Sequence, residues 1–394
     1  MASYRHRTGV RTVLASVFTM MLVVVSGTAL RLGEPGPGTQ SQESGTLANA
    51  VTVIAVSRTD QFAGAVGEAS TLFVGSLNGT VAKMDATTGH ILGSVRLPDG
   101  NSAAHLTYYN GSLYVGTEWL IRARDQPPFH IYRIDPSTMK IAAQIPMESH
   151  FANGFVLAFN GFLWAGDGHC TLYKIDPNRM LVLGTIPEVA EDEMAFDGTH
   201  YWAECMSTVN VLIPGAGFPV PVASGSLSYP ERPRGFFMID NGIYTSGTLD
   251  FTIYSMSLAG RSVIFRSVVP KGDESTPTRD TVEFGGLIYA YETSPRADLG
   301  QLPARIYEYS RTLHLLSVVT LPGPALGVDA SQHSLFTLDG KLYFVTESSV
   351  GHIELTQGSN NSTTVGSSTP TTSVSTVGPN YRNDDNVPRI ETAA

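Results

Sequence analysis

The sequence predicts an all-β fold, a β-propeller of about seven four-stranded blades. Two observations predict it: short apolar strands separated by turn residues, and one aromatic strand that recurs at a fixed spacing. The composition agrees, because the 394-residue chain is 42% hydrophobic and 15% charged, with 39 glycines and 23 prolines. Such punctuation is typical of many short strands and turns around a core.

The clearest repeat runs from Val156 to Pro187. It contains four short strands, which we expect at 156–159 and 162–165 and within 172–177 and 181–187. The first two are separated by Asn160-Gly161, a pair that favours a hairpin turn with positive φ. Asp176-Pro177 follows the third strand and marks the next chain reversal.

The same phrases return along the chain. Asn110-Gly111 is followed by a Leu-Tyr-Val strand, and residues 131–136 repeat the Ile-Tyr-x-Ile-Asp-Pro pattern. Each second strand carries an aromatic residue, and these are Phe73, Tyr114, Trp164, Trp202, Tyr244, Tyr289 and Tyr343. They recur about every 45 residues, which is a propeller spacing.

The phrases Asn-Gly-x-Leu-Tyr-Val and Ile-Tyr-x-Ile-Asp-Pro resemble those of the YVTN-type and quinoprotein-like β-propeller superfamily. The resemblance covers about three-quarters of the chain. It implies the fold but no particular activity, because this architecture hosts unrelated chemistries. The tryptophan-docking repeats of quinone-dependent dehydrogenases are not visible, so the resemblance implies no quinone cofactor.

The chain divides into four segments. Residues 1–30 join a basic start to an uncharged apolar run, which predicts a secretory signal peptide or a retained signal-anchor. Residues 31–49 are expected to be a flexible linker, 50–356 the propeller, and 357–394 a disordered Ser/Thr-rich tail. The protein is therefore expected to be secreted or extracellular, or anchored to a membrane through its N-terminus. Four glycosylation sequons fit that compartment, at Asn78, Asn110, Asn360 and Asn361.

The two chain ends are expected to close the ring. The seventh repeat supplies three strands, at 334–338, 342–345 and 352–355, and the sequence turns polar at Gln357. Residues 51–56 form an apolar, β-branched run that precedes the first full repeat. We expect this run to be the outer strand of the last blade, since both end blades would otherwise expose strand edges. The alternative is a strand packed across the disc.

Cys170 and Cys205 are the only cysteines, and both follow the second strand of consecutive repeats. In an oxidising compartment they could form one disulfide, or they could remain two buried thiols. A disulfide requires their Cα atoms to lie within about 7 Å.

Two sets of connections line one face of a propeller: those between the second and third strands, and those between blades. On this face we expect the ligand-binding residues, and the candidates are Glu118, Asp167, His169, Glu204, Arg232 and Glu292. Converging carboxylates could hold Ca²⁺ as a cofactor, or they could simply face solvent. His105, His150 and His169 could form a transition-metal site, although no short ligand spacing supports one.

Several function classes find no support. The net charge is −10 and Lys and Arg form no stripe, which argues against nucleic acid. No Gly-x-Ser-x-Gly elbow and no glycine-rich phosphate loop is present.

The leading hypothesis is an extracellular binding module that recognises a protein or small-molecule ligand through the loops of one face. One alternative is a metal-dependent propeller hydrolase or lactonase. Another is a structural cell-surface protein that contacts the membrane only through an uncleaved N-terminal segment. The sequence does not decide whether the protein is an enzyme.

Overall fold

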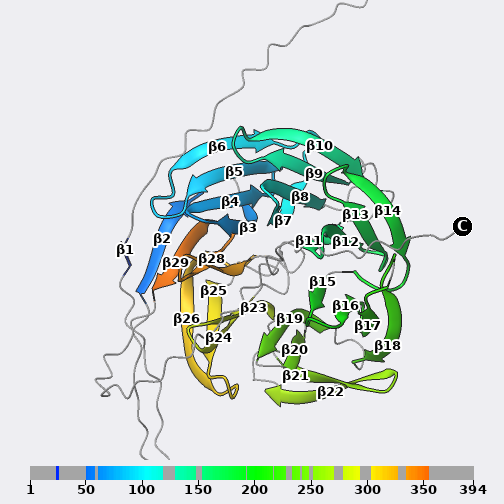
Figure 1. Ribbon diagram of the computed structural model, residues 1–394. Helices are drawn as coiled ribbons and strands as arrows, with labels where there is room; N and C mark the ends of the chain where they lie inside the picture. The colour runs from blue at the N-terminus through cyan, green and yellow to red at the C-terminus, as the bar shows by residue number, and fades with distance from the viewer. Residues whose placement is uncertain are drawn as a thin grey trace, which may run out of the picture.

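The computed structural model describes residues 24–25, 50–57, 61–118, 129–147, 153–191, 193–215, 217–227, 233–239, 242–247, 252–269, 278–292, 303–326 and 334–354. In these ranges the regular elements are β-strands, arranged as a ring of blades (Figure 1). None of the described residues forms a helix long and apolar enough to cross a membrane.

Seven blades follow one another in chain order, each with its first strand innermost and its fourth strand outermost. Blade 1 consists of β3 (Phe62–Glu68), β4 (Thr71–Ser76), β5 (Thr80–Asp85) and β6 (Ile91–Arg96). Blade 2 consists of β7 (Ser102–Tyr109), β8 (Ser112–Glu118), β9 (His130–Asp135) and β10 (Lys140–Pro146). Blade 3 consists of β11 (Asn153–Phe159), β12 (Phe162–Asp167), β13 (Leu172–Asp176) and β14 (Leu181–Ile186).

The remaining blades repeat this order. Blade 4 consists of β15 (Glu193–Phe196), β16 (Tyr201–Cys205), β17 (Thr208–Ile213) and β18 (Val220–Ser226). Blade 5 consists of β19 (Pro233–Ile239), β20 (Gly242–Gly247), β21 (Ile253–Ala259) and β22 (Ser262–Val269). Blade 6 consists of β23 (Thr278–Phe284), β24 (Leu287–Glu292), β25 (Pro303–Tyr309) and β26 (Leu315–Pro324). Blade 7 takes β27 (Leu335–Leu338), β28 (Lys341–Val345) and β29 (Ser349–Glu354) from the C-terminal side of the ring.

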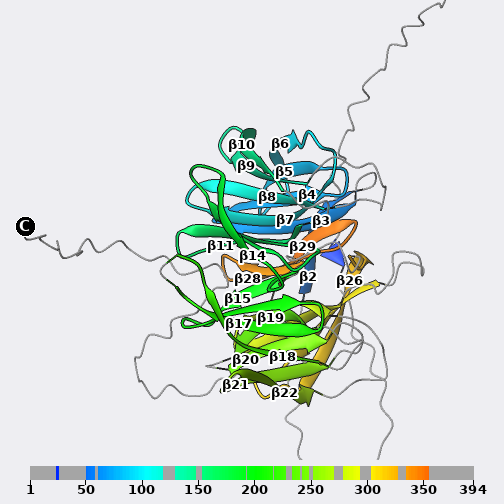
Figure 2. The same cartoon turned by 90° about the vertical axis from the view of Figure 1, so that its right-hand side faces the viewer.

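Ring closure by the two ends of the domain is confirmed. The seventh blade obtains its outer strand from β2 (Ala50–Val56), which pairs antiparallel with β29 from Ala50↔Glu354 to Val56↔Ser349. A two-residue strand, β1 (Val24–Val25), adds to the free edge of β2. The predicted blade architecture is thus confirmed, and the first and last blades lie side by side (Figures 1 and 2).

One contact joins neighbouring blades at the rim. β18 of blade 4 and β22 of blade 5 share a single parallel bridge, Ser224↔Ser262, so the two blades form one continuous eight-stranded sheet. This bridge connects the outer strands of blades 4 and 5, and the sequence repeats do not predict it.

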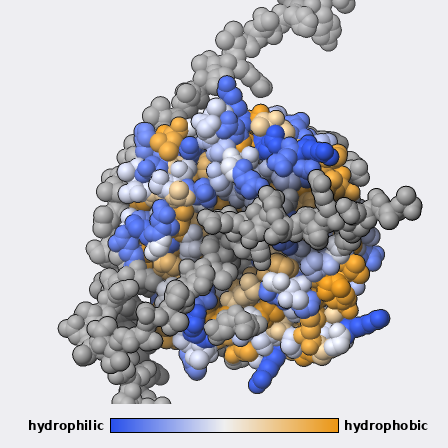
Figure 3. All heavy atoms as spheres, in the orientation of Figure 1, coloured by the Kyte–Doolittle hydropathy of each residue, from blue (hydrophilic) through white to orange (hydrophobic). Residues whose placement is uncertain are grey.

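The core lies between blades rather than within one. The second-strand aromatic residues are buried in these layers, except Tyr244, which is half-buried. Each layer combines two neighbours: Ile54 and Tyr343 of blade 7 pack with Leu72 and Met84 of blade 1. The outer strands keep exposed apolar side chains, among them Leu181, Leu183, Leu315, Leu316 and Val318. Apolar residues accordingly show at the edge of the disc in Figure 3.

Candidate functional site

The two faces of the disc differ in their connections. On one face, here called the turn face, first and second strands are joined by tight hairpins such as Asn110-Gly111 and Asn160-Gly161. Both asparagines have positive φ, 47° and 52°, as Asn-Gly hairpins require. On the opposite face, here called the loop face, the connections between strands two and three and between blades include the long stretches 119–129, 270–277, 293–302 and 325–334. Any extended recognition surface is therefore expected on the loop face.

In five blades a polar residue lies at the end of the second strand or within one residue of it, always three residues after the aromatic residue. These residues are Ser76, Thr117, Asp167, Glu292 and Thr346. In four of them the side chain bonds the backbone of the turn that follows or of the third strand; Ser76, for example, accepts from the Thr80 amide at 3.2 Å. We call these five residues the strand-end latches. They hold in place the residues at which the loop-face connections begin or end.

Asp167 shows what such a latch does. Its Oδ1 accepts hydrogen bonds from the amides of His169 at 3.0 Å and Thr171 at 2.9 Å. Its Oδ2 accepts the Tyr173 hydroxyl at 2.9 Å. The Asp167 side chain is buried, whereas His169 is exposed at the tip of the turn. The carboxylate thus holds this turn, and His169 is the residue available at the surface.

Glu292 occupies the same position in blade 6. Its Oε2 accepts the Tyr307 hydroxyl at 3.1 Å and lies 4.0 Å from Arg305 Nη1. Glu292 is only 4% exposed. Its carboxylate therefore binds β24 to β25 rather than projecting from a loop.

Glu204 lies one position earlier in its strand than the latches. Its Cα partner across the ladder is Glu193. In the first three blades this position is Gly75, Gly116 or Gly166, and a Cβ on Gly75 would overlap the Ala103 carbonyl of the next blade. Glu204 is 0% exposed. It is thus an interior residue, not a loop carboxylate.

Glu118 contacts the innermost strand of its own blade. Its Oε2 lies 3.6 Å from His105 Nε2, and the side chains are 13% and 2% exposed. Ser102 is the Cα partner of Glu118 in the ladder. Among the described residues, the Ser102 hydroxyl and both ring nitrogens of His105 have no hydrogen-bond partner. These three residues form a polar group in the interior of blade 2.

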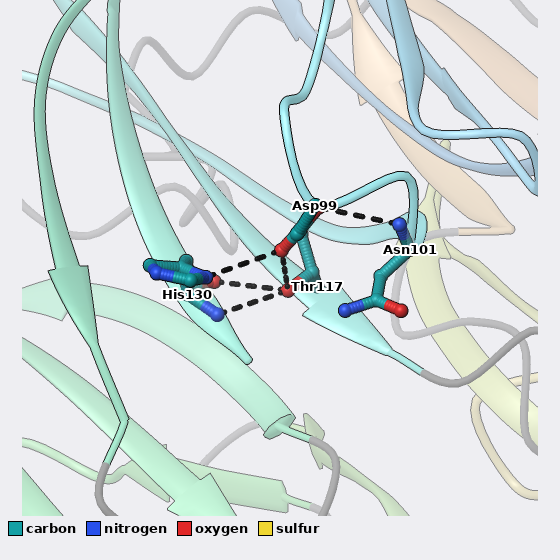
Figure 4. Close-up of polar contacts among 4 residues, drawn as sticks. All are labelled: Asp99, Asn101, Thr117 and His130. Atoms are coloured by element: carbon teal, nitrogen blue, oxygen red, sulfur yellow. Dashed lines mark hydrogen bonds and ion pairs between the residues drawn. The ribbon is translucent and has the colours of Figure 1, made fainter. Parts of the chain in front are cut away.

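Asp99 lies at the root of the same blade (Figure 4). Its Oδ2 accepts the Thr117 hydroxyl at 3.1 Å and lies 3.3 Å from His130 Nδ1. Thr117 in turn accepts the His130 amide at 3.0 Å. Burial raises the pKa of the neighbouring Tyr132, and the Asp99 charge adds to that rise. In a catalytic pair of a hydroxyl and a histidine, the hydroxyl donates to an imidazole nitrogen. Here the Thr117 hydroxyl donates to Asp99 instead, so Thr117 acts as a strand-end latch.

Two further carboxylates tie one blade to the next. Glu193 on β15 accepts the amides of Gly235 and Phe236 on β19, the second at 3.0 Å. Asp280 on β23 similarly accepts the amides of Ser334 and Leu335 in blade 7. Both carboxylates hold the inner strands of neighbouring blades together.

Cys170 and Cys205 form a disulfide between blades 3 and 4, with 5.2 Å between their Cα atoms. Glu191 accepts the Met206 amide at 3.0 Å beside it. The loop-face ends of blades 3 and 4 are thus joined both covalently and by hydrogen bonds.

The four carboxylate candidates lie in second strands of four different blades. Glu118, Asp167 and Glu292 end their strands, Glu204 is the penultimate residue of β16, and the contacts named above for each lie within its own blade. The expectation that loops carry these carboxylates is therefore wrong, because the strands extend further than their apolar centres suggest. Within the described part of the chain, no three His, Cys, Asp or Glu side chains form a group that could hold a metal ion. Arg232 and His150 lie outside the described residues.

Sequence reasoning missed Thr117, Asp99 and His130. A signal was present, because aligning the seven aromatic residues places Thr117 in register with Asp167 and Glu292. The partner Asp99 precedes the blade and is connected to it only by the fold.

Strand topology and ring closure define the protein as a seven-bladed β-propeller. No known protein-family profile matches the chain, and no curated protein matches it. Among solved structures it is similar to BamB from Moraxella catarrhalis, at 14% sequence identity and a TM-score of 0.48, over 74% of this chain and 81% of that one. No conclusion about activity follows from a likeness at this level.

Proposed function

We propose that this propeller is a secreted or cell-surface binding module that recognises a protein or small-molecule ligand through its loop face. The asymmetry between the two faces supports the proposal most. Tight hairpins occupy the turn face, while the long connections leave and return at the loop face. Binding residues are concentrated on loops that a rigid scaffold holds in place.

The polar residues divide into two groups by burial. Asp167, Glu204 and Glu292 are at most 4% exposed, so they are assigned to holding the scaffold. His169 is exposed and Glu118 is half-buried, so these two remain candidates for contacting a ligand. Arg232 belongs to a connection between blades and is proposed as a third contact on sequence alone.

The loop-face connections carry both charges. Residues 119–128 contain Arg122, Arg124 and Asp125, and residues 270–277 contain Lys271 and Asp273. Mixed charges give an interface orientation and specificity more than raw affinity. This supports a protein partner of the propeller over a nucleic acid or a uniformly charged surface.

The cellular assignment belongs to the same proposal. The basic and apolar N-terminal segment supports export, and the disulfide supports an oxidising compartment. Membership of the YVTN-type and quinoprotein-like superfamily is likewise proposed from the repeat phrases. Sequencing the N-terminus of the mature protein would distinguish a cleaved signal from an anchor.

The test replaces residues 121–126 of the full chain with a Gly/Ser stretch of equal length. The matched control is Asn160→Gly, a change in an exposed hairpin of the turn face. Fluorescently labelled proteins are then applied to the surface of the producing cells, with and without protease treatment of those cells. Loss of binding in the loop variant alone is expected. Equal binding by all three proteins would refute recognition through the loop face.

A parallel measurement addresses catalysis. Metal content of the purified chain is determined by mass spectrometry, and hydrolysis of an aliphatic lactone and of a nitrophenyl ester is assayed. A stoichiometric divalent cation together with lactone turnover would overturn the binding-module proposal in favour of a hydrolase.

A further inference from the structure

Asn110 occupies the tip of the hairpin that joins β7 to β8 on the turn face. The strands end at the pair Tyr109↔Ser112, so the loop consists of Asn110 and Gly111 alone. Their φ values of 47° and 74° are those of a tight hairpin whose two central residues are both left-handed. Both residues are exposed, and a Cβ built on Gly111 meets nothing within 4 Å beyond its chain neighbours. The tip of this hairpin therefore projects into open space.

The blade 2 hairpin differs from its equivalents in the third residue of the turn sequence. Asn-Gly recurs at the same place of the repeat in blades 3 and 5, where Phe162 and Ile243 follow. In blade 2 the following residue is Ser112, which completes Asn-Gly-Ser, an acceptor sequence for an N-linked glycan. Of these three Asn-Gly pairs, only the one in blade 2 has the hydroxyl side chain that the acceptor sequence requires.

The side chain of Asn160 has a role in the fold that the side chain of Asn110 does not have. Asn160 Nδ2 donates to the Tyr201 hydroxyl of blade 4 at 2.7 Å, so it ties the blade 3 hairpin to the next blade. Within the described part of the chain, the Asn110 side chain makes no hydrogen bond. A sugar attached to Asn110 Nδ2 would therefore displace no contact of the protein.

The other acceptor sequence among the described residues, Asn78-Gly79-Thr80, has the opposite surroundings. It connects β4 to β5 on the loop face. Asn78 is half-buried, and its Oδ1 accepts the Ser76 hydroxyl at 2.7 Å and the Thr80 amide at 2.9 Å. Gly79 is buried, and a Cβ built on it would lie 2.6 Å from the Asn101 carbonyl oxygen. This turn is held by its own side chains and packs against the chain that leads to blade 2, so it suits a bulky surface substituent poorly.

We infer that the folded protein carries an N-linked glycan on Asn110 and none on Asn78. The inference rests on the export of the chain, which is part of the proposed function. The sequons at Asn360 and Asn361 lie outside the described residues and carry no part of the argument.

The modification is a glycosyl transfer from a lipid-linked oligosaccharide to an exported chain. Asn110 Nδ2 forms a bond to the anomeric carbon of the first sugar. The bond from that carbon to the phosphate of the lipid donor breaks, and the phosphate leaves with the bonding electron pair. The Asn110 amide gives one proton to a base of the transferase, so the step needs no oxidant or reductant.

A glycan on Asn110 gives the two faces of the disc different surroundings. N-linked glycans are bulky and solubilising, so this one would keep large molecules from packing closely against the turn face at blade 2. On the loop face, Asn78 would remain unmodified. The glycan thus leaves the proposed recognition surface open and keeps the opposite face in solvent.

Mass spectrometry of intact glycopeptides tests the assignment on the full chain purified from its own cells. The peptide that contains Asn110 should carry the mass of an oligosaccharide, and the peptide that contains Asn78 should be unmodified. An unmodified Asn110 peptide would overturn the inference, and a glycan on Asn78 would overturn the selection between the two sequons by burial. Failure of the proposed function is detected separately, by the mature N-terminus and by the loop-face binding assay.

Matched variants separate the acceptor sequence from the turn itself. Asn110→Asp and Asn78→Asp each remove a sequon and keep a short side-chain oxygen that suits a turn. Asn110→Asp should lower the mass of the purified protein by the whole glycan, whereas Asn78→Asp should leave the glycan in place. Ser112→Ala should also abolish the glycan, and Ser112→Thr should retain it. Binding to the producing cells should be unchanged in Asn110→Asp. Persistence of the glycan mass on the Asn110 peptide in Ser112→Ala, or on the same peptide in Asn110→Asp, would refute the assignment.

Discussion

Ring closure makes a quantitative prediction at Gly89. This glycine is buried in the blade 1 turn, has a φ of 66°, and lies so close to β2 that a Cβ would overlap the Ile54 carbonyl oxygen. The contact exists only because β2 fills the outer position of blade 7. Gly89→Ala should therefore separate blade 1 from the closing strand.

The magnitude follows from a matched control. Gly100 has a nearly equal φ of 68°, but no atom lies within 4 Å of a Cβ built on it. Gly100→Ala should cost about 1–2 kcal/mol for the left-handed conformation alone. Gly89→Ala bears the same conformational cost and adds about 1–3 kcal/mol for the overlap. Effects of the lost glycine on the unfolded chain are the same in both variants and cancel.

Urea unfolding of both variants, followed by tryptophan fluorescence, measures the difference. Gly89→Ala should lower the free energy of unfolding by at least about 1 kcal/mol more than Gly100→Ala does. Equal losses in the two variants would contradict the placement of β2 beside blade 1.

Three further outcomes are expected. Replacing both Cys170 and Cys205 with Ala should lower the free energy of unfolding by about 3–4 kcal/mol, since the disulfide closes a loop with a sequence separation of 35. An unchanged midpoint of unfolding in urea would show that the disulfide does not stabilise the fold. Asp167→Ala removes the acceptor for two amides and the Tyr173 hydroxyl, so it should cost about 2–3 kcal/mol and speed amide exchange at 168–171; unaltered exchange there would remove the latch assignment. Burial lowers the pKa of His352 below its usual 6.5, so the folded protein favours the neutral imidazole. The contribution of neutral His352 to stability should be present above pH 6.5 and be lost as the pH falls through the lowered pKa. A His352→Gln variant whose stability has the same pH dependence as that of the wild type would refute this assignment.

Much of the fold could be predicted because its signals are local. Asn-Gly pairs set hairpins within a few residues, and the second-strand aromatic residues repeat in each blade. The closing strand at 51–56 was also identified, because the seventh repeat is one strand short. Each inference needed only neighbouring residues or a count of repeats.

The site was predicted less well, for a physical reason. A carboxylate at the end of a strand has the same sequence signature whether it faces solvent or accepts backbone amides. Glu193 is engaged by Gly235 and Phe236, and Asp280 by Ser334 and Leu335, across blade boundaries. These contacts depend on how two blades pack, which no local pattern reports.

The sequence by itself therefore determined the architecture: an all-β ring of seven blades whose last blade borrows its outer strand from the N-terminal side. Only the tertiary structure decided what the polar residues do. It assigned Asp167 and Glu292 to latches, paired Cys170 with Cys205, and left the Tyr289 hydroxyl without a described acceptor. Strands form from short-range periodicity, whereas the partner of a buried polar atom is set by the packing of segments distant in the chain.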